Sequence, residues 1–164
     1  TPDAVGVSGI GPVLLPADAD GRPLRPAILY GVDTRATREI AELTDEIGAE
    51  EIVARGGTPL SSQAVGPKWR WLRRHEPGVW DATRYFFMAS SYLVHRLTGE
   101  YVLDHHSASQ CDPMYDLEAA DWAPDLADVV APGLVTGLGN VVGAIATGIG
   151  DALTQSASTS GVRS

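Results

Sequence analysis

The stretch Pro26–Arg35, with the sequence PAILYGVDTR, constrains the fold of this chain more than any other. It opens with the apolar run Ala27–Tyr30, breaks at Gly31 and then brings Asp33 and Arg35. A short, continuous apolar run is typical of a buried strand. Polar side chains just past such a strand lie at its carboxyl edge, where open α/β sheets bind ligands. The stretch therefore predicts an α/β domain with a ligand contact at Asp33.

Asp33 has a second interpretation that the residues alone leave open. Aspartate is a preferred N-cap residue, because its side chain accepts hydrogen bonds from the first free N–H groups of a helix. A helix that begins near Thr34 would use Asp33 in this way. The pattern alone favours the helix cap over the ligand contact.

Composition indicates an ordinary globular domain and excludes some classes of partner. Of the 164 residues, 44% are hydrophobic and 20% are charged, as in typical soluble proteins. No apolar run approaches the roughly 20 residues of a membrane helix, so no membrane partner is expected. The net charge of −9 disfavours a nucleic-acid partner, which would require a basic face. The single cysteine, Cys111, excludes an internal disulfide and makes a cytoplasmic location the simplest expectation.

Short apolar segments predict the strands of the fold. The first predicted strand along the chain, Ala4–Ser8, is expected to be buried. After the second, Val13–Leu15, the turn sequence DADG at residues 18–21 predicts a hairpin that returns toward the third, Ala27–Tyr30. The other predicted strands are Tyr85–Met88, Tyr101–Leu103 and Val141–Ile145.

Apolar residues at helical spacing, bounded by glycine or proline, predict a series of helices. Between Asp104 and Asp116 the chain is mostly polar and is expected to be irregular, with a short helix from Ser107. The other predicted helices are Thr37–Glu46, Glu50–Arg55, Pro67–His75, a short helix from Pro77, Ser90–Leu97 and Trp122–Val130.

Two of these helices carry further expectations about their faces. In the helix Ser90–Leu97, apolar residues are expected to face the core. The helix Pro67–His75 is the only strongly basic segment, and its basic residues are expected to form a solvated face. The residues concerned are Tyr92, Leu93 and Leu97 in the first helix and Lys68, Arg70, Arg73 and Arg74 in the second.

No standard catalytic motif is found in the sequence. The segment Gly6–Ile10 lacks the final glycine of a nucleophile elbow, and neither a dinucleotide-binding fingerprint nor a Walker A loop is present. His105, His106 and Cys111 raise the question of a metal, but they follow no known ligand spacing, so loop histidines are the favoured interpretation. Cys111 has no further support as a nucleophile, and a buried structural thiol is expected.

The two ends of the sequence predict a fragment of a longer protein. The chain begins at Thr1 without a methionine and finishes in a segment rich in Gly, Ala, Ser and Thr. We therefore expect residues 1–132 to be part of a domain that is incomplete at both ends. Residues 133–164 are expected to form a tail that is poorly ordered toward its end.

A series of short motifs follows in a fixed order along the chain. They are AVGVSG at 4–9, DGRPLRPAILY at 20–30, DTRA at 33–36, GPKWRWL at 66–72, HEP at 75–77, YLVHRLTGEY at 92–101 and DW at 121–122. In order and spacing, from Ala4 to about Val130, this set resembles the N-terminal domain of the FGGY carbohydrate kinases. That family includes xylulokinase, glycerol kinase and ribulokinase, and the motifs look most like its xylulokinase side.

The resemblance implies a ribonuclease-H-like α/β fold, the architecture of actin and hexokinase. It implies an ATP-dependent kinase that transfers the γ-phosphoryl group to a sugar hydroxyl, with a pentulose such as xylulose as the favoured substrate. ATP and Mg²⁺ are expected in the complete enzyme, while this fragment should bind neither tightly and should be inactive alone. No catalytic, cofactor-binding or metal-ligating residue is assigned within the chain.

The resemblance also assigns candidate substrate-binding residues. Gly11 and Pro12 lie in the turn that contacts the sugar in xylulokinases, although neither offers a polar side chain, which leaves the identity of the sugar open. Gln63 stands where glycerol kinases use a tyrosine, and its amide can still hydrogen-bond a hydroxyl. Asp33 matches the family's aspartate near the sugar, which raises the ligand contact above the helix cap.

A different class of function remains open at this point, a non-catalytic binding or scaffold remnant of the same fold. The DNA beyond both ends would separate the two, because an upstream Asp-x-Gly-Thr hairpin and a downstream Gly-rich aspartate segment favour a kinase. In the family, further strands cover the equivalent of Ala4–Ser8. We therefore expect an uncovered strand edge there and self-association of the chain through it.

Overall fold

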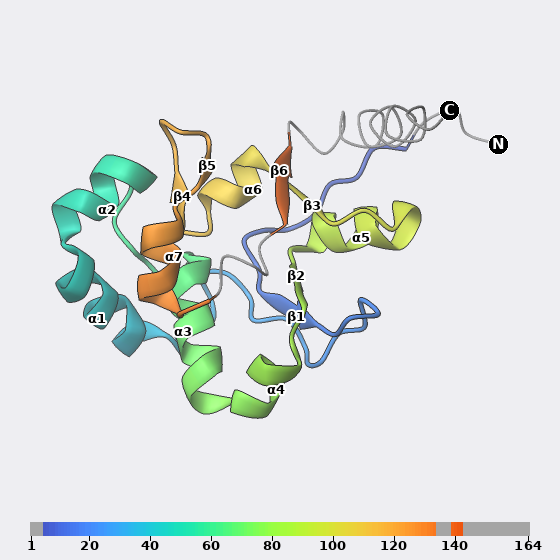
Figure 1. Cartoon of the computed structure of the whole chain (residues 1–164), viewed down its shortest axis with the longest axis horizontal. Helices are drawn as coiled ribbons and strands as arrows, with labels where there is room; N and C mark the ends of the chain where they lie inside the picture. Colours follow the sequence, from blue (N-terminus) through green and yellow to red (C-terminus); the bar gives the residue numbers. More distant parts are fainter. Residues whose placement is uncertain (1–4, 134–138, 143–164) are drawn as a thin grey trace, which may run out of the picture.

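The protein is arranged around helix α3 (Val65–His75), in a computed structural model that describes residues 5–133 and 139–142. Helices α1, α4 and α7 all pack against α3, and Figure 1 shows α3 in the middle of the helical side of the molecule. The helices are α1 (Thr37–Ile47), α2 (Ala49–Gly56), α3, α4 (Pro77–Ala82), α5 (Ala89–Thr98), α6 (His105–Ser109) and α7 (Pro124–Val130).

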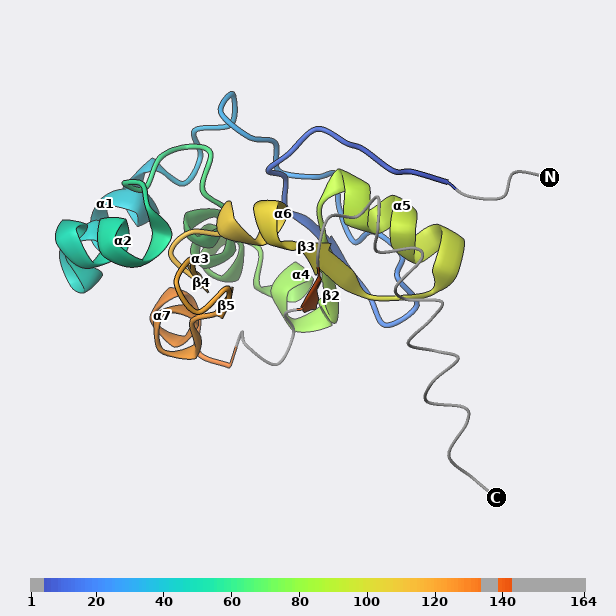
Figure 2. The ribbon, with the colours of Figure 1, turned by 90° about the horizontal axis from the view of Figure 1, so that it is seen from above.

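Within the described residues the strands form two-stranded pairs. Strand β1 (Leu15–Ala17) pairs antiparallel with β2 (Tyr85–Phe87). Strand β3 (Val102–Asp104) pairs in parallel with β6 (Asn140–Val142), which joins residues far apart in the sequence. The short strands β4 (Tyr115–Asp116) and β5 (Asp121–Trp122) form a third, antiparallel pair. Seen from above, the strand pairs β1–β2 and β3–β6 lie beside α5, away from α1 and α2 (Figure 2).

The core is centred on Trp69, whose side chain is only 2% exposed. Its ring packs edge-on against Trp80, at 5.4 Å between centroids, and against Phe86, at 5.5 Å. Edge-to-face packing of this kind stabilises aromatic pairs beyond the burial of their area. The ring therefore ties α3 to both α4 and β2, and α3 is buried along most of its length.

Several predicted elements are confirmed with shifted bounds. Helices α1 and α2 begin and end within two residues of the predictions, and α7 begins at Pro124. The turn at residues 18–21 is closed by hydrogen bonds between Asp18 and Arg22. Strand β1 begins two residues later than predicted. The remainder of the predicted strand Val141–Ile145, and most of the predicted tail, lie outside the described residues.

Two of the predicted strands, Ala27–Tyr30 and Ala4–Ser8, are wrong. Of Ala27–Tyr30, only Ile28 pairs, in an isolated bridge with Leu14, and Leu29 is 47% exposed. Residues 5–8 of the predicted strand Ala4–Ser8 form no strand, and Val5 is 44% exposed. A strand requires a ladder of backbone hydrogen bonds, and the described residues offer none to this segment. Self-association stays a prediction, without support from a strand edge at residues 5–8.

Two of the four basic residues of α3, Lys68 and Arg70, are buried. The prediction that all four form a solvated face is therefore wrong for these two. Arg70 is 7% exposed and donates to both carboxylate oxygens of Glu46, at 2.8 and 2.7 Å. It also donates to the backbone carbonyls of Val129 and Val130 at the end of α7. The planar guanidinium can satisfy several acceptors at once. Arg70 therefore joins α1, α3 and α7, and the lysine two positions earlier is buried as well.

Two of the three apolar positions predicted to face the core in helix α5 are exposed, while the third, Tyr92, packs against Phe87. Leu93 is 47% exposed and Leu97 is 62% exposed, whereas Ser90 and Ser91 are buried with Val94. The Ser91 hydroxyl accepts from the Met88 backbone N–H at 2.8 Å, which pairs a backbone group at the start of the helix. Local capping and close packing override the apolar pattern in this helix.

Candidate functional site

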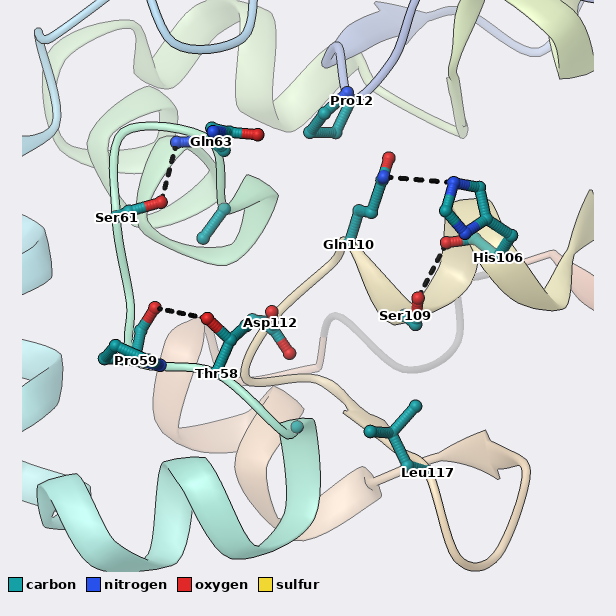
Figure 3. Close-up of a pocket in the computed structure, with 12 residues that line it drawn as sticks. Pro12, Thr58, Pro59, Ser61, Gln63, His106, Ser109, Gln110, Asp112 and Leu117 are labelled. Carbon is teal, nitrogen blue, oxygen red and sulfur yellow. Dashed lines mark hydrogen bonds between the residues drawn. The ribbon is translucent and has the colours of Figure 1, made fainter.

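A pocket of about 300 Å³ opens where the loop between α2 and α3 meets α6 and the turn at Pro12. Figure 3 shows the Pro12 and Gln63 side on one flank of the pocket and Gln110 with His106 on another. Pockets of this size accept small molecules. The lining residues are Pro12, Gly56, Thr58, Pro59, Ser61, Gln63, Ala64, His106, Ser109, Gln110, Asp112 and Leu117.

The loop between α2 and α3 is held by short-range hydrogen bonds. Helix α2 ends at Gly56, and Gly57 adopts a left-handed conformation that glycine tolerates without strain. The Ser61 hydroxyl accepts from the backbone N–H of Gln63 at 3.2 Å (Figure 3). The Gln63 side chain makes no hydrogen bond within the described residues, so its amide is free to contact a ligand in the pocket.

Lys68 supports this loop from below. Its side chain is 1% exposed, and its Nζ atom donates to the backbone carbonyl of Gln63 at 3.4 Å. Burial lowers the pKa of Lys68 to about 8, while the nearby carboxylate of Asp33 acts in the opposite direction. The lysine that was expected on a solvated surface therefore anchors the backbone beside the pocket.

Helix α6 supplies the polar groups on the opposite flank. The Asp104 carboxylate accepts from the backbone N–H of Ser107 at 2.9 Å and so caps the helix. At its other end, the Gln110 amide lies 3.3 Å from the Nε2 atom of His106, and the Ser109 hydroxyl donates to the His106 carbonyl (Figure 3). The loop after α6 then caps α3, because the carbonyls of Gln110 and Asp112 accept from the first N–H groups of that helix.

Asp112 stands out among the lining residues, because one oxygen of its carboxyl group is buried without a hydrogen-bond partner in the part of the chain that the structure describes. The residue is 4% exposed, and its Oδ1 atom makes no hydrogen bond within the described residues. Burial raises the pKa of Asp112 to about 7, because the charged form loses its hydration. Oδ1 lies against the backbone of Gly56, where a Cβ atom would overlap it. The glycine at the end of α2 therefore makes room for this carboxyl group.

Asp33 lies outside this pocket. Its carboxylate accepts from the Arg35 side chain at 2.8 Å and from the Arg35 backbone N–H at 3.2 Å. The hydrogen bond from Arg35 is the main reason that the pKa of Asp33 is lowered. Arg35 in turn stacks on the ring of Trp71, 4.7 Å from its centroid. Helix α1 begins at Thr37 with Ala36 as its N-cap, so the interpretation of Asp33 as the helix cap is wrong.

The structure brings together two of the four predicted site residues. Pro12 and Gln63 line the same pocket, and Gly11 lies beside it, where an added Cβ would approach the Gln110 side chain at 3.5 Å. A sugar contact by any of the four stays a prediction. Asp112 was not singled out from the sequence, because a carboxylate in a polar stretch gives no sign of burial.

The family of this chain is identified by its match to a protein-family model. A model of the N-terminal domain of the FGGY family of carbohydrate kinases matches residues 1–163. The chain belongs to the FGGY family of carbohydrate kinases. The resemblance in its ordered motifs is therefore confirmed.

Curated relatives of this FGGY chain include kinases for different substrates. A xylulose kinase of Streptomyces coelicolor is 37% identical over 107 residues, which are 65% of this chain and 22% of the relative. A glycerol kinase of Nocardia farcinica is 34% identical over 112 residues, which are 66% of this chain and 22% of the relative. The FGGY chain thus spans less than a quarter of the length of these relatives.

Solved structures confirm the predicted fold class for the FGGY chain. The crystal structure of a xylulose kinase from Rhodospirillum rubrum matches with a TM-score of 0.77 and 32% identity, over 85% of this chain and 28% of that chain. A glycerol kinase from Plasmodium falciparum also gives a TM-score of 0.77, over 84% of this chain and 28% of that chain, and at 20% identity it shows the fold alone. These neighbours have the actin and hexokinase type of α/β fold.

Proposed function

We propose that the full-length protein containing this chain transfers the γ-phosphoryl group of ATP to a sugar hydroxyl, with a pentulose such as xylulose as the favoured substrate. The observation that carries the proposal is the pocket that Pro12 and Gln63 share, because the family resemblance assigned both residues to the sugar. Relatives named xylulose kinase and glycerol kinase support the reaction class. In this proposal the chain supplies part of one wall of the sugar site.

ATP and Mg²⁺ enter the proposal through the family and not through the described residues. Within residues 5–133 and 139–142, no group of three or more His, Cys, Asp or Glu side chains could hold a metal ion. ATP and Mg²⁺ are therefore proposed for the full-length protein on its family alone, and no step is derived through them. In the same described ranges, no helix is long and apolar enough to cross a membrane. A cytoplasmic location stays a prediction.

The first test compares the full-length protein with the 164-residue chain. We expect the full-length protein to form ADP from ATP with D-xylulose, in a coupled assay run beside glycerol. The chain alone should give no ADP above background, because loss of a general base alone costs roughly 10²- to 10⁴-fold in rate, and phosphoryl transfer also needs positioned phosphates and Mg²⁺. A full-length protein that turns over neither sugar would contradict the proposal.

A second test concerns Asp33, whose role in sugar binding is untested. If the Asp33 carboxylate bonds a sugar hydroxyl, Asp33→Ala in the full-length protein should lower kcat/KM for D-xylulose. The loss should correspond to about 1–3 kcal/mol of transition-state stabilisation. The KM for ATP should change little. Asp20→Ala is a matched control, because Asp20 is an exposed carboxylate paired with Arg22 on the hairpin turn. Normal sugar kinetics in the Asp33 variant, with only a lower Tm, would limit Asp33 to holding Arg35.

A further inference from the structure

The buried Oδ1 atom of Asp112 has no hydrogen-bond partner within the described residues. A buried polar group normally makes a hydrogen bond, and one that makes none costs free energy. Asp112 is 4% exposed, its Oδ1 atom makes no hydrogen bond within the described residues, and it lines the pocket with Gln63 and Gln110. Figure 3 shows its carboxyl group lying between the Thr58–Pro59 loop and the end of α6. Oδ1 itself lies against Gly56, so a molecule bound in the pocket would meet the carboxyl group where Asp112 lines the pocket.

The other lining groups define the chemistry of that molecule. Around the carboxyl group, the pocket presents side-chain amides, hydroxyls and one imidazole, from Gln63, Gln110, Thr58, Ser61, Ser109 and His106. Among the described lining residues there is no lysine or arginine. A negatively charged ligand would thus meet a carboxyl group and no fixed positive charge. Hydroxyl groups, in contrast, can both donate to and accept from these side chains.

We propose that Asp112 is a specificity-determining residue of the pocket: its carboxyl group accepts a hydrogen bond from a hydroxyl of a neutral sugar and disfavours sugars that carry a carboxylate. This inference rests on the proposed function, because it takes the sugar of the kinase reaction to occupy this pocket. A hydrogen bond to a charged acceptor is roughly twice as strong as one between neutral groups. Two like charges close together in a poorly hydrated site repel each other strongly. The same carboxyl group therefore favours one class of sugar and opposes the other.

The pH dependence of binding should carry the signature of this carboxyl group. The ionised form is the stronger acceptor, so D-xylulose should bind more tightly at pH 8 than at pH 6. The titratable groups on the surrounding elements are His106 on α6, Arg55 on α2, Lys68 on α3 and the neighbouring Cys111. Arg55 is occupied by ion pairs with Asp116 and Asp125, and Lys68 donates to the Gln63 backbone. His106 is the remaining ionisable side chain that lines the pocket, so a pH dependence that persists in His106→Gln does not come from the imidazole.

The experiment measures D-xylulose and D-gluconate with the full-length protein and its Asp112→Asn variant, which keeps the shape of the side chain. Binding is read as the ligand-induced rise in Tm without ATP, and turnover as ADP release. We expect the variant to bind D-xylulose about 10-fold more weakly and to lose most of its preference over D-gluconate. The KM for ATP should not change. The variant should also lose the difference in D-xylulose binding between pH 6 and pH 8.

Each outcome separates this inference from the proposed function. Asp121→Asn is the matched control, because it makes the same chemical change at an exposed carboxylate outside the pocket, and it should bind like the wild type. Equal sugar preference in wild type and Asp112→Asn would overturn the inference, even if the protein is a kinase. Failure of the wild type to bind any neutral sugar would also overturn it. Binding that shifts as expected without any turnover would contradict the kinase proposal alone.

Discussion

Gly66→Ala is expected to destabilise the protein by about 3 kcal/mol or more. A Cβ atom at this position would overlap the backbone carbonyl of Asp112 and would lie 2.8 Å from the Cδ atom of Pro113. The backbone N–H of Gly66 donates to that same carbonyl at 3.0 Å, so the clash falls on the hydrogen bond that caps α3. Neither the carbonyl nor the proline ring can move away as a flexible side chain could. Urea denaturation of the purified protein measures the loss.

The expected loss of stability in Gly66→Ala is opposite in sign to the gain that helix propensity alone would give for a change from glycine to alanine. In a helix without close neighbours, glycine to alanine raises stability by up to about 1 kcal/mol. Gly78 in α4 is exposed, and an added Cβ would meet nothing within 4 Å. Gly78→Ala should therefore leave the free energy of unfolding unchanged or raise it slightly. If both variants proved equally stable, the close approach of α3 to the loop after α6 would be refuted.

The sequence predicted the helices of this fold better than its strands. Helix α1 could be read from apolar residues at helical spacing with Gly48 as the stop, and the structure has it with nearly the same bounds. Ala27–Tyr30 reads as a strand only because its residues are apolar, and whether an apolar run forms a ladder depends on partners elsewhere in the chain. Ile28 finds a single partner, Leu14. Local pattern carries helix formation, whereas strand pairing is decided by distant residues.

The candidate site was predictable only where the family motif gave a position. Gln63 and Pro12 were assigned through the resemblance, and the structure places both beside one pocket. Lys68 and Asp112 could not be found from the pattern, because charged residues are rarely buried and the sequence shows no partner for either. Lys68 follows the Gly66-Pro67 pair in one of the family motifs, which was the only available signal. Burial of charge is a property of the assembled fold.

The stability of the protein should fall as pH rises from about 5 to 8, and Asp112 should account for a separable part of this fall. Burial raises the pKa of Asp112 in the folded protein to about 7, whereas an unfolded aspartate titrates near 3.9. Between these two values the folded state holds a proton that the unfolded state has released. The stabilisation is therefore complete below about pH 4 and is lost as the pH rises through about 7. From pH 5 to pH 8 the loss amounts to about 2–3 kcal/mol.

Asp112→Asn isolates this contribution, because asparagine does not titrate. At pH 5, where the buried carboxyl group is neutral, the variant should have a lower free energy of unfolding than the wild type. Between pH 5 and pH 8 the difference in free energy of unfolding should shift by about 2–3 kcal/mol in favour of the variant. The measurement is the free energy of unfolding from urea denaturation of both proteins at the two pH values. The other titratable groups, His106 among them, are common to both proteins and cancel in the difference. A difference that is the same at pH 5 and pH 8 would show that Asp112 is ionised with an ordinary pKa in the folded protein. The carboxyl group would then be hydrated and not buried against Gly56.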